Sequence, residues 1–159
     1  MNTTCDPTTM DLFRSLAGMQ LERVWACRYS GVNVYNQLVM EFTKTLWLRV
    51  DLRIEAIAPR ADVYVVQARS LHVLPEMSEW DRLKLGEFVV EDVCLLRRED
   101  DKGQGLVVDS GFCFVSEHGA ELSFDADLFP LVFQMRYESA ISPVLPRTRI
   151  AVGEQRVPQ

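Results

Sequence analysis

Four carboxylates and one histidine stand within eleven residues in the stretch EHGAELSFDAD, residues 117–127. Such side chains hold metals or move protons where they converge on one point. Gly119 predicts a hairpin turn, because glycine accepts the positive φ that tight turns require. In the strand that follows, side chains on one face would stand about 7 Å apart, since each residue rises about 3.3 Å. That spacing is too wide for two carboxylates to share a tightly bound metal, so the stretch predicts no metal site.

The same alternation predicts which way these carboxylates point. Leu122, Phe124 and Ala126 fall on one face of the expected strand, and the acidic residues that follow the turn fall on the other. A solvated strand face is the simplest interpretation, and a recognition surface for a cationic partner is the functional one. The residues of this acidic strip are Glu117, at the turn, and Glu121, Asp125 and Asp127.

A second candidate surface lies in LWLRVDLRIEA, residues 46–56, where apolar and polar residues alternate without a break. A helix would scatter the apolar residues around its circumference, whereas a strand places all of them on one face. We therefore predict a strand with an indole on its polar face, either anchoring a partner or packed under a helix or the other half of the chain. The candidate binding residues of this face are Trp47, Arg49, Asp51 and Arg53.

No motif for catalysis, metal binding or cofactor binding is present in the sequence. The sequence has two histidines, His72 and His118, but no G-x-S-x-G motif that would supply a serine nucleophile for them. It also has neither a Walker loop nor a G-x-G-x-x-G motif for binding phosphates. The cysteines form no C-x-x-C pair, and Cys27, Cys94 and Cys113 lie in apolar stretches, which predicts buried, reduced thiols. The sequence therefore predicts no enzyme activity, no metal and no cofactor.

Acidic residues outnumber basic residues by 23 to 17, so the net charge is −6. Nucleic acids and anionic membranes attract basic surfaces, so this charge argues against both and favours a basic protein as partner. No apolar run approaches the roughly 20 residues that span a bilayer. The first residues also lack the basic and apolar regions of a signal peptide, so we expect a cytoplasmic protein.

Two halves of the chain share short matches at a nearly constant spacing of about 68 residues. LVME at 38–41 resembles LVVD at 106–109, and VVQAR at 65–69 resembles VFQMR at 132–136. These matches predict an internal duplication, with residues 11–71 and 78–139 as the two units.

Each unit is predicted to begin with a short helix and to continue with four strands. TTMDLFRSLAG, residues 8–18, has a threonine cap before Met10, and SEWDRLKLG, residues 78–86, has a serine cap; both end in glycine. Short loops between strands favour antiparallel pairing. We therefore expect an α+β fold dominated by antiparallel sheets, built as two helix-plus-four-strand meanders. Residues 1–140 would form one domain, and the proline-containing residues 141–159 an extended tail.

These observations favour a binding protein without catalytic activity. A small acidic inhibitor needs a rigid scaffold and a charged surface, as a bacterial immunity protein does when it neutralises a basic toxin or enzyme. The alternatives are an enzyme with a carboxylate-lined cleft between the two halves, and a structural subunit of a larger assembly. Sedimentation at several concentrations separates the last case from the first, since the sequence leaves the oligomeric state open.

Overall fold

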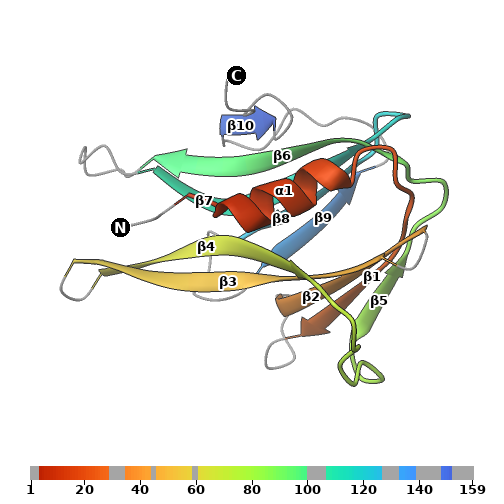
Figure 1. The fold of residues 1–159 in the computed structure, drawn as a ribbon, viewed down its shortest axis with the longest axis horizontal. Helices are drawn as coiled ribbons and strands as arrows, with labels where there is room; N and C mark the ends of the chain where they lie inside the picture. Colours follow the sequence, from red (N-terminus) through yellow and green to blue (C-terminus); the bar gives the residue numbers. More distant parts are fainter. Residues whose placement is uncertain are drawn as a thin grey trace.

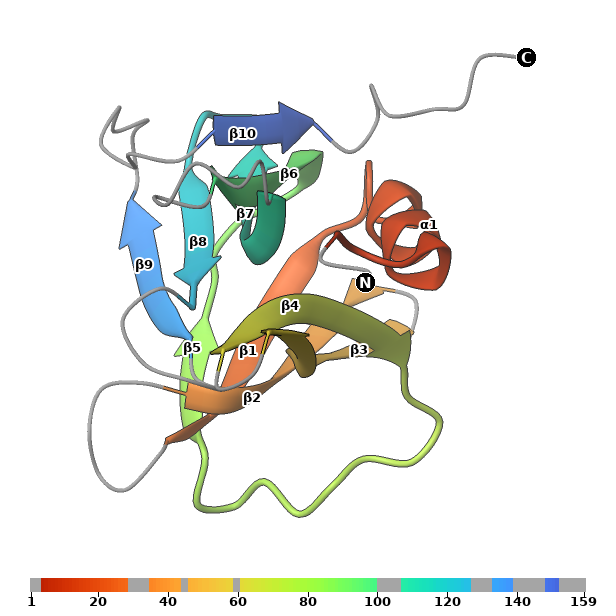
Figure 2. The same ribbon diagram turned by 90° about the vertical axis from the view of Figure 1, so that its left-hand side faces the viewer.

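Two antiparallel five-stranded sheets pack against each other in the computed structural model, and one described helix lies between them at one side (Figure 1). The structure describes residues 4–28, 35–43, 46–58, 61–99, 107–126, 133–138 and 148–151. The view turned by 90° shows the helix beside β4 and the two sheets above and below the core (Figure 2). The predicted β-dominated fold with antiparallel sheets is therefore confirmed.

Each sheet is formed by strands that follow one another along the chain. The helix is α1 (Pro7–Ser15). The first sheet contains β1 (Leu21–Arg28), β2 (Tyr35–Phe42), β3 (Leu46–Ala58), β4 (Ala61–Ser70) and β5 (Asp81–Lys84). The second sheet contains β6 (Val90–Glu99), β7 (Val107–Ser116), β8 (Glu121–Asp125), β9 (Gln134–Glu138) and β10 (Thr148–Ala151).

The two sheets have the same strand order. The first is ordered β4-β3-β2-β1-β5 and the second β10-β6-β7-β8-β9, so in both the fifth strand along the chain pairs with the first. Both of these pairings are antiparallel. Part of the predicted C-terminal tail, residues 148–151, thus completes the second sheet, and residues 141–147 and 152–159 lie outside the described part of the chain.

The alternation at residues 46–56 forms the strand that it predicts, since β3 runs through all of them. Leu48 and Val50 are fully buried on its inner face. The neighbouring strands place Leu38 and Ala68 opposite Val50, so that apolar side chains continue across the sheet. Each such side chain stabilises the fold by about 1.5–3 kcal/mol relative to exposure in water.

The capping residue of helix α1 lies three residues before the predicted threonine cap, Thr9. Asp6 is the capping residue: its Oδ1 accepts the N–H of Thr9 at 2.7 Å, and Pro7 occupies the first turn, where its missing N–H has no cost. Gly18 follows the helix with a φ of +83°, as expected for a glycine just past a helix end. Met10 and Phe13 are buried, so the helix packs its apolar face into the core.

The predicted second helix at residues 78–86 is wrong, because residues 81–84 form β5. Arg82 and Lys84 are exposed and alternate with the more buried Leu83 and Leu85, as in a strand. The segment is so short that its sequence pattern fits a helix as well. Pairing with β1 supplies the backbone hydrogen bonds and decides between the two. The second half therefore lacks the helix that would make it a copy of the first, and the duplication stays a prediction.

One apolar core fills the space between the sheets. The largest fully buried aromatic side chains come from α1, from both sheets and from the segments before β6 and β9: Phe13, Phe42, Phe88, Phe112, Phe114, Phe124 and Phe133. Reciprocal backbone hydrogen bonds between Tyr35 and Phe133, with N···O distances of 2.9 and 2.6 Å, tie β2 to the segment before β9. Between the described parts of the two sheets, the buried apolar side chains thus form one continuous cluster.

Candidate binding face

The acidic strip does not form a continuous exposed surface. Glu117 is exposed at the turn, and Gly119 there has the expected positive φ of 85°. Glu121, however, is only 5% exposed, and its Oε1 accepts the S–H of Cys113 at 3.1 Å. Asp125 is half-buried, and Asp127 lies outside the described residues. The expectation that Glu121 projects from a solvated face is therefore wrong.

The physical reason is that β8 is covered on both faces. Its inner face packs Leu122 and Phe124 into the core, and it lies between β7 and β9. On the opposite face, Glu121 and Ser123 are also buried, and they lie beside Val115 and Cys113 of β7, which belong to a second apolar cluster with Cys94 and Leu96. Alternation predicted which residues share a face of β8, but it did not predict that both faces are buried.

The first sheet presents a different kind of outer face, which brings cationic and aromatic side chains together. Strand register sets them in two rows across the sheet, opposite the inner face that carries Val24 and Ala26. One row is Lys84, Arg23, Glu41 and Trp47, and the other is Arg82, Trp25, Val39, Arg49 and Arg69. We call Arg23, Trp25, Trp47, Arg49, Arg69, Arg82 and Lys84 the cationic face.

Two carboxylates on this surface neutralise part of its charge. Arg23 pairs with Glu41 at 3.1 Å, and Asp51 receives both Arg49 at 3.2 Å and Arg69 at 3.5 Å. Pairs as exposed as these contribute at most about 1 kcal/mol each to stability. Their main effect is to orient the guanidinium groups of Arg23, Arg49 and Arg69.

Trp25 and Trp47 supply the apolar part of the cationic face. Both indoles are half-buried, and Val39, which lies beside Trp25 in the register, is fully buried although it belongs to the outer side of the sheet. The guanidinium carbon of Arg82 lies 5.5 Å from the centre of the Trp25 ring, a cation–π contact. A binding surface of this composition combines rigid aromatic area with donors for hydrogen bonds.

Sequence reasoning missed Trp25 and grouped Arg53 with the wrong neighbours. An irregularity between Leu21 and Arg23 shifts the alternation in β1, so period two did not assign Trp25 to a face. Of the four residues predicted from β3, the structure brings Trp47, Arg49 and Asp51 together on the outer face, and it directs Arg53 elsewhere.

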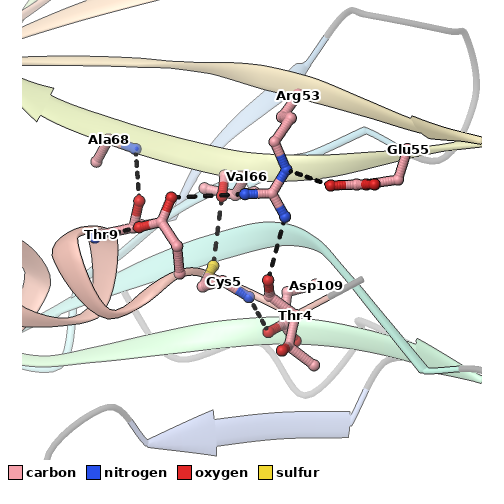
Figure 3. A network of polar contacts seen from close by, with 9 residues as sticks. Thr4, Cys5, Thr9, Arg53, Glu55, Val66, Ala68 and Asp109 are labelled. Carbon is pink, nitrogen blue, oxygen red and sulfur yellow. Dashed lines mark hydrogen bonds and ion pairs between the residues drawn. The ribbon is translucent and has the colours of Figure 1, made fainter. Parts of the chain in front are cut away.

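Arg53 holds the N-terminal segment in place instead (Figure 3). Its Nη2 donates to the carbonyl of Thr4 at 3.4 Å, and its Nε pairs with Glu55 at 3.0 Å. Val63 and Val65 of the neighbouring strand pack with Val108 of β7, so this end of the β3–β4 pair is covered by the second sheet.

The same N-terminal segment closes the free edge of β4. The Sγ of Cys5 donates to the carbonyl of Val66 at 3.5 Å, and the hydroxyl of Thr9 accepts the N–H of Ala68 at 3.0 Å (Figure 3). The backbone N–H of Cys5 donates to the fully buried carboxylate of Asp109 at 2.9 Å. An uncovered strand edge invites pairing with another chain, so these contacts are structural.

Burial and the nearby carboxylate of Asp109 raise the pKa of the Cys5 thiol above its ordinary value. A thiolate is the reactive form of cysteine, so Cys5 is a poor nucleophile at neutral pH. The predicted burial is confirmed for Cys94 and Cys113 but not for Cys27, which is half-buried. None of the four cysteines forms a disulfide.

We expect Cys27 to react with a thiol reagent at pH 8 well before the other three cysteines. Its side chain is partly accessible, whereas Cys5, Cys94 and Cys113 need local opening of the fold to react. Mass spectrometry after a short pulse of maleimide measures the order. Labelling of Cys5 at the rate of Cys27 in the native state would contradict the position of the N-terminal segment.

Within the described ranges, no three residues of the types His, Cys, Asp or Glu come close enough together to hold a metal ion. None of the described helices has the length and apolar character needed to cross a membrane. No protein-family model matches the chain, and neither a curated protein nor a solved structure shows significant similarity to it.

Proposed function

We propose that the protein is a non-catalytic, protein-binding protein that recognises its partner through the cationic face. One observation carries this proposal: two half-buried tryptophans, Trp25 and Trp47, lie among arginines on one side of an open sheet. Tryptophan and arginine are the residues most enriched where protein interfaces concentrate their binding energy. The first sheet thus offers both the apolar anchor and the hydrogen-bond donors of an interface.

The position of these residues on paired strands also supports recognition. Strands held on both sides by neighbours keep their side chains in fixed positions, and binding then costs little conformational entropy. Arg49 is oriented by Asp51, and Arg23 by Glu41, before any partner arrives. Such preorganisation increases affinity without further contacts.

Within this class, we propose an inhibitor that acts in the cytoplasm as an immunity protein does, by binding a toxin or enzyme directly. The net charge of −6 supports long-range attraction to a partner that is basic overall. Burial of Glu121 weakens the argument that the acidic strip makes the contact. A partner that is basic overall can still carry a local patch that complements arginine and tryptophan. We propose that this patch is what contacts the cationic face.

We also propose an internal duplication whose units differ from the predicted residues 11–71 and 78–139. Because β5, at residues 81–84, belongs to the first sheet, the copies would be the two five-stranded sheets without the helix. Their strand orders are the same, and the matched glutamines Gln67 and Gln134 both lie in the fourth strand of their sheets. Under this proposal the outer faces have diverged. The second sheet buries Cys94 and Cys113 there, whereas the first carries the tryptophans and arginines that recognise a partner.

Substitutions on the cationic face should weaken binding without unfolding the protein. The parent protein is used to capture a stoichiometric partner from its native lysate, and calorimetry then measures the affinity of the purified pair. Because loss of a central interface residue costs about 2 kcal/mol or more, we expect Trp47→Ala to weaken binding at least 30-fold and Arg49→Ala about tenfold.

Glu117→Gln is the matched control, because Glu117 is exposed on the second sheet and is part of the acidic strip. We expect its affinity to equal that of the parent. Parent-like affinity for both face variants, with weaker binding only for Glu117→Gln, would move recognition to the acidic strip.

A further inference from the structure

We infer that Arg82, Lys84 and Arg23, at the β5 end of the cationic face, form a subsite for the carboxylates of an acidic protein segment. This inference rests on the proposed function, because it specifies the chemistry of the partner at that face. The starting point is strand register: Lys84 lies directly opposite Arg23, and Arg82 lies directly opposite Trp25.

Two like charges directly opposite each other destabilise an antiparallel pair. Arg23 is balanced by Glu41 on its other side, at 3.1 Å. Among the described residues, however, neither Arg82 nor Lys84 forms an ion pair with a carboxylate. Within the described part of the chain, two exposed cations at this place therefore take part in no ion pair.

The nearest carboxylate along the chain is already engaged on the opposite side of β5. Asp81 Oδ2 accepts from Arg28 at 2.9 Å and 2.6 Å, and from the hydroxyl of Tyr35 at 3.2 Å. Asp81 lies opposite the buried Ala26, whereas Arg82 lies opposite Trp25. Asp81 thus does not neutralise Arg82, and the positive charge on the outer face remains available to a ligand.

The surroundings of these cations are suited to hold a carboxylate. A polar pocket of about 240 Å³ lies beside Arg23 and Lys84, which line it together with Gln20, Glu22 and Leu85. The guanidinium carbon of Arg82 lies 5.5 Å from the centre of the Trp25 ring, and this contact limits the movement of the exposed side chain. A restrained guanidinium presents two parallel N–H donors, the geometry that matches a carboxylate.

The carboxylates on this face favour an acidic protein segment over a nucleic acid. Glu22 lines the pocket itself, and Glu41 and Asp51 lie farther along the face. A nucleic acid carries phosphates at regular spacing and would meet these carboxylates, in addition to a net charge of −6 on the protein. A flexible acidic peptide is able to bring two or three of its carboxylates to Arg82 and Lys84 and to keep the others in solvent, away from Glu41 and Asp51.

The test uses three fluorescein-labelled probes of equal length: an octaglutamate peptide, an octaglutamine peptide and an eight-nucleotide deoxythymidine strand. Fluorescence anisotropy at low ionic strength measures their binding to the full chain. We expect the octaglutamate peptide to bind at least tenfold more tightly than either of the others. Binding should also shift the indole NMR signal of Trp25.

The double charge reversal Arg82→Glu with Lys84→Glu should lower octaglutamate affinity at least tenfold, and Arg82→Gln with Lys84→Gln should lower it severalfold. The control is Arg14→Glu with Arg136→Glu, which changes the net charge equally outside the cationic face. Equal loss in the control, no octaglutamate binding, or tighter binding of the oligonucleotide would each overturn the inference. If Trp47→Ala weakens binding of the captured partner and the Arg82 and Lys84 variants do not, the inferred subsite is contradicted, while the proposal that the cationic face binds the partner is supported.

Discussion

Replacing Asp109 by alanine is expected to lower the free energy of unfolding by about 3–5 kcal/mol, the cost of breaking a buried ion pair from one side. Asp109 is fully buried on β7 and holds Arg97 of β6 in a bidentate contact, with N···O distances of 2.8 and 3.2 Å. It also accepts the backbone N–H of Cys5. Removing the carboxylate leaves a guanidinium and a backbone donor without their acceptor.

A β-bulge explains why a carboxylate occupies this position. Arg97 lies opposite Asp109 and Leu96 opposite Gly111, so Ser110 is the extra residue that turns Asp109 toward Arg97. Urea denaturation of the variant and the parent measures the difference. Asp11→Ala is the control, because Asp11 is an exposed partner of Arg14 on α1 and its loss should cost less than about 0.5 kcal/mol. A similar small loss for Asp109→Ala would show that the N-terminal segment is not held at β7.

Replacing Phe112 by alanine is expected to cost about 3–5 kcal/mol, because it removes a large buried ring and leaves a cavity. Phe112 is fully buried at the centre of the aromatic cluster. Its ring centre lies 5.3 Å from that of Phe13, 4.8 Å from that of Phe124 and 5.9 Å from that of Phe133. One side chain thus contacts α1 and two other segments of the second sheet.

Phe112→Leu should recover most of this loss, since leucine fills much of the same volume. Tyr137→Ala is the control: Tyr137 is 45% exposed, and its ring centre lies 6.4 Å from that of Phe88 at the edge of the core. Its loss should cost about 1 kcal/mol or less. Thermal unfolding of the three variants ranks them. An equal effect of Phe112→Ala and Tyr137→Ala would contradict a single core between the sheets.

Long, unbroken alternation was sufficient to predict β3 and the β-rich fold. Residues 46–56 alternate over eleven positions, and no helix is compatible with that pattern. The segment 78–86 was too short for such a decision, because its leucines fit a helix and a strand equally well. Pairing with β1, a tertiary effect, determined that it forms β5.

The candidate site was predicted only in part, for reasons that are also tertiary. Alternation placed Trp47, Arg49 and Asp51 on one face of β3, and the structure brings them together. The irregularity in β1 hid Trp25, and the cover over the far end of β3 redirected Arg53 to Thr4. Glu121 was misplaced because period two gives the side of a strand but not what covers that side.

Footprinting of the captured complex tests the binding face most directly. Carbene labelling of the free protein and of the complex, read by mass spectrometry, reports the loss of solvent access at each residue. We predict that Trp25, Trp47 and Arg82 lose labelling on complex formation, while Glu117 and Tyr137 on the second sheet keep theirs. Protection of Glu117 and Tyr137 with unchanged labelling of both tryptophans would contradict recognition through the cationic face.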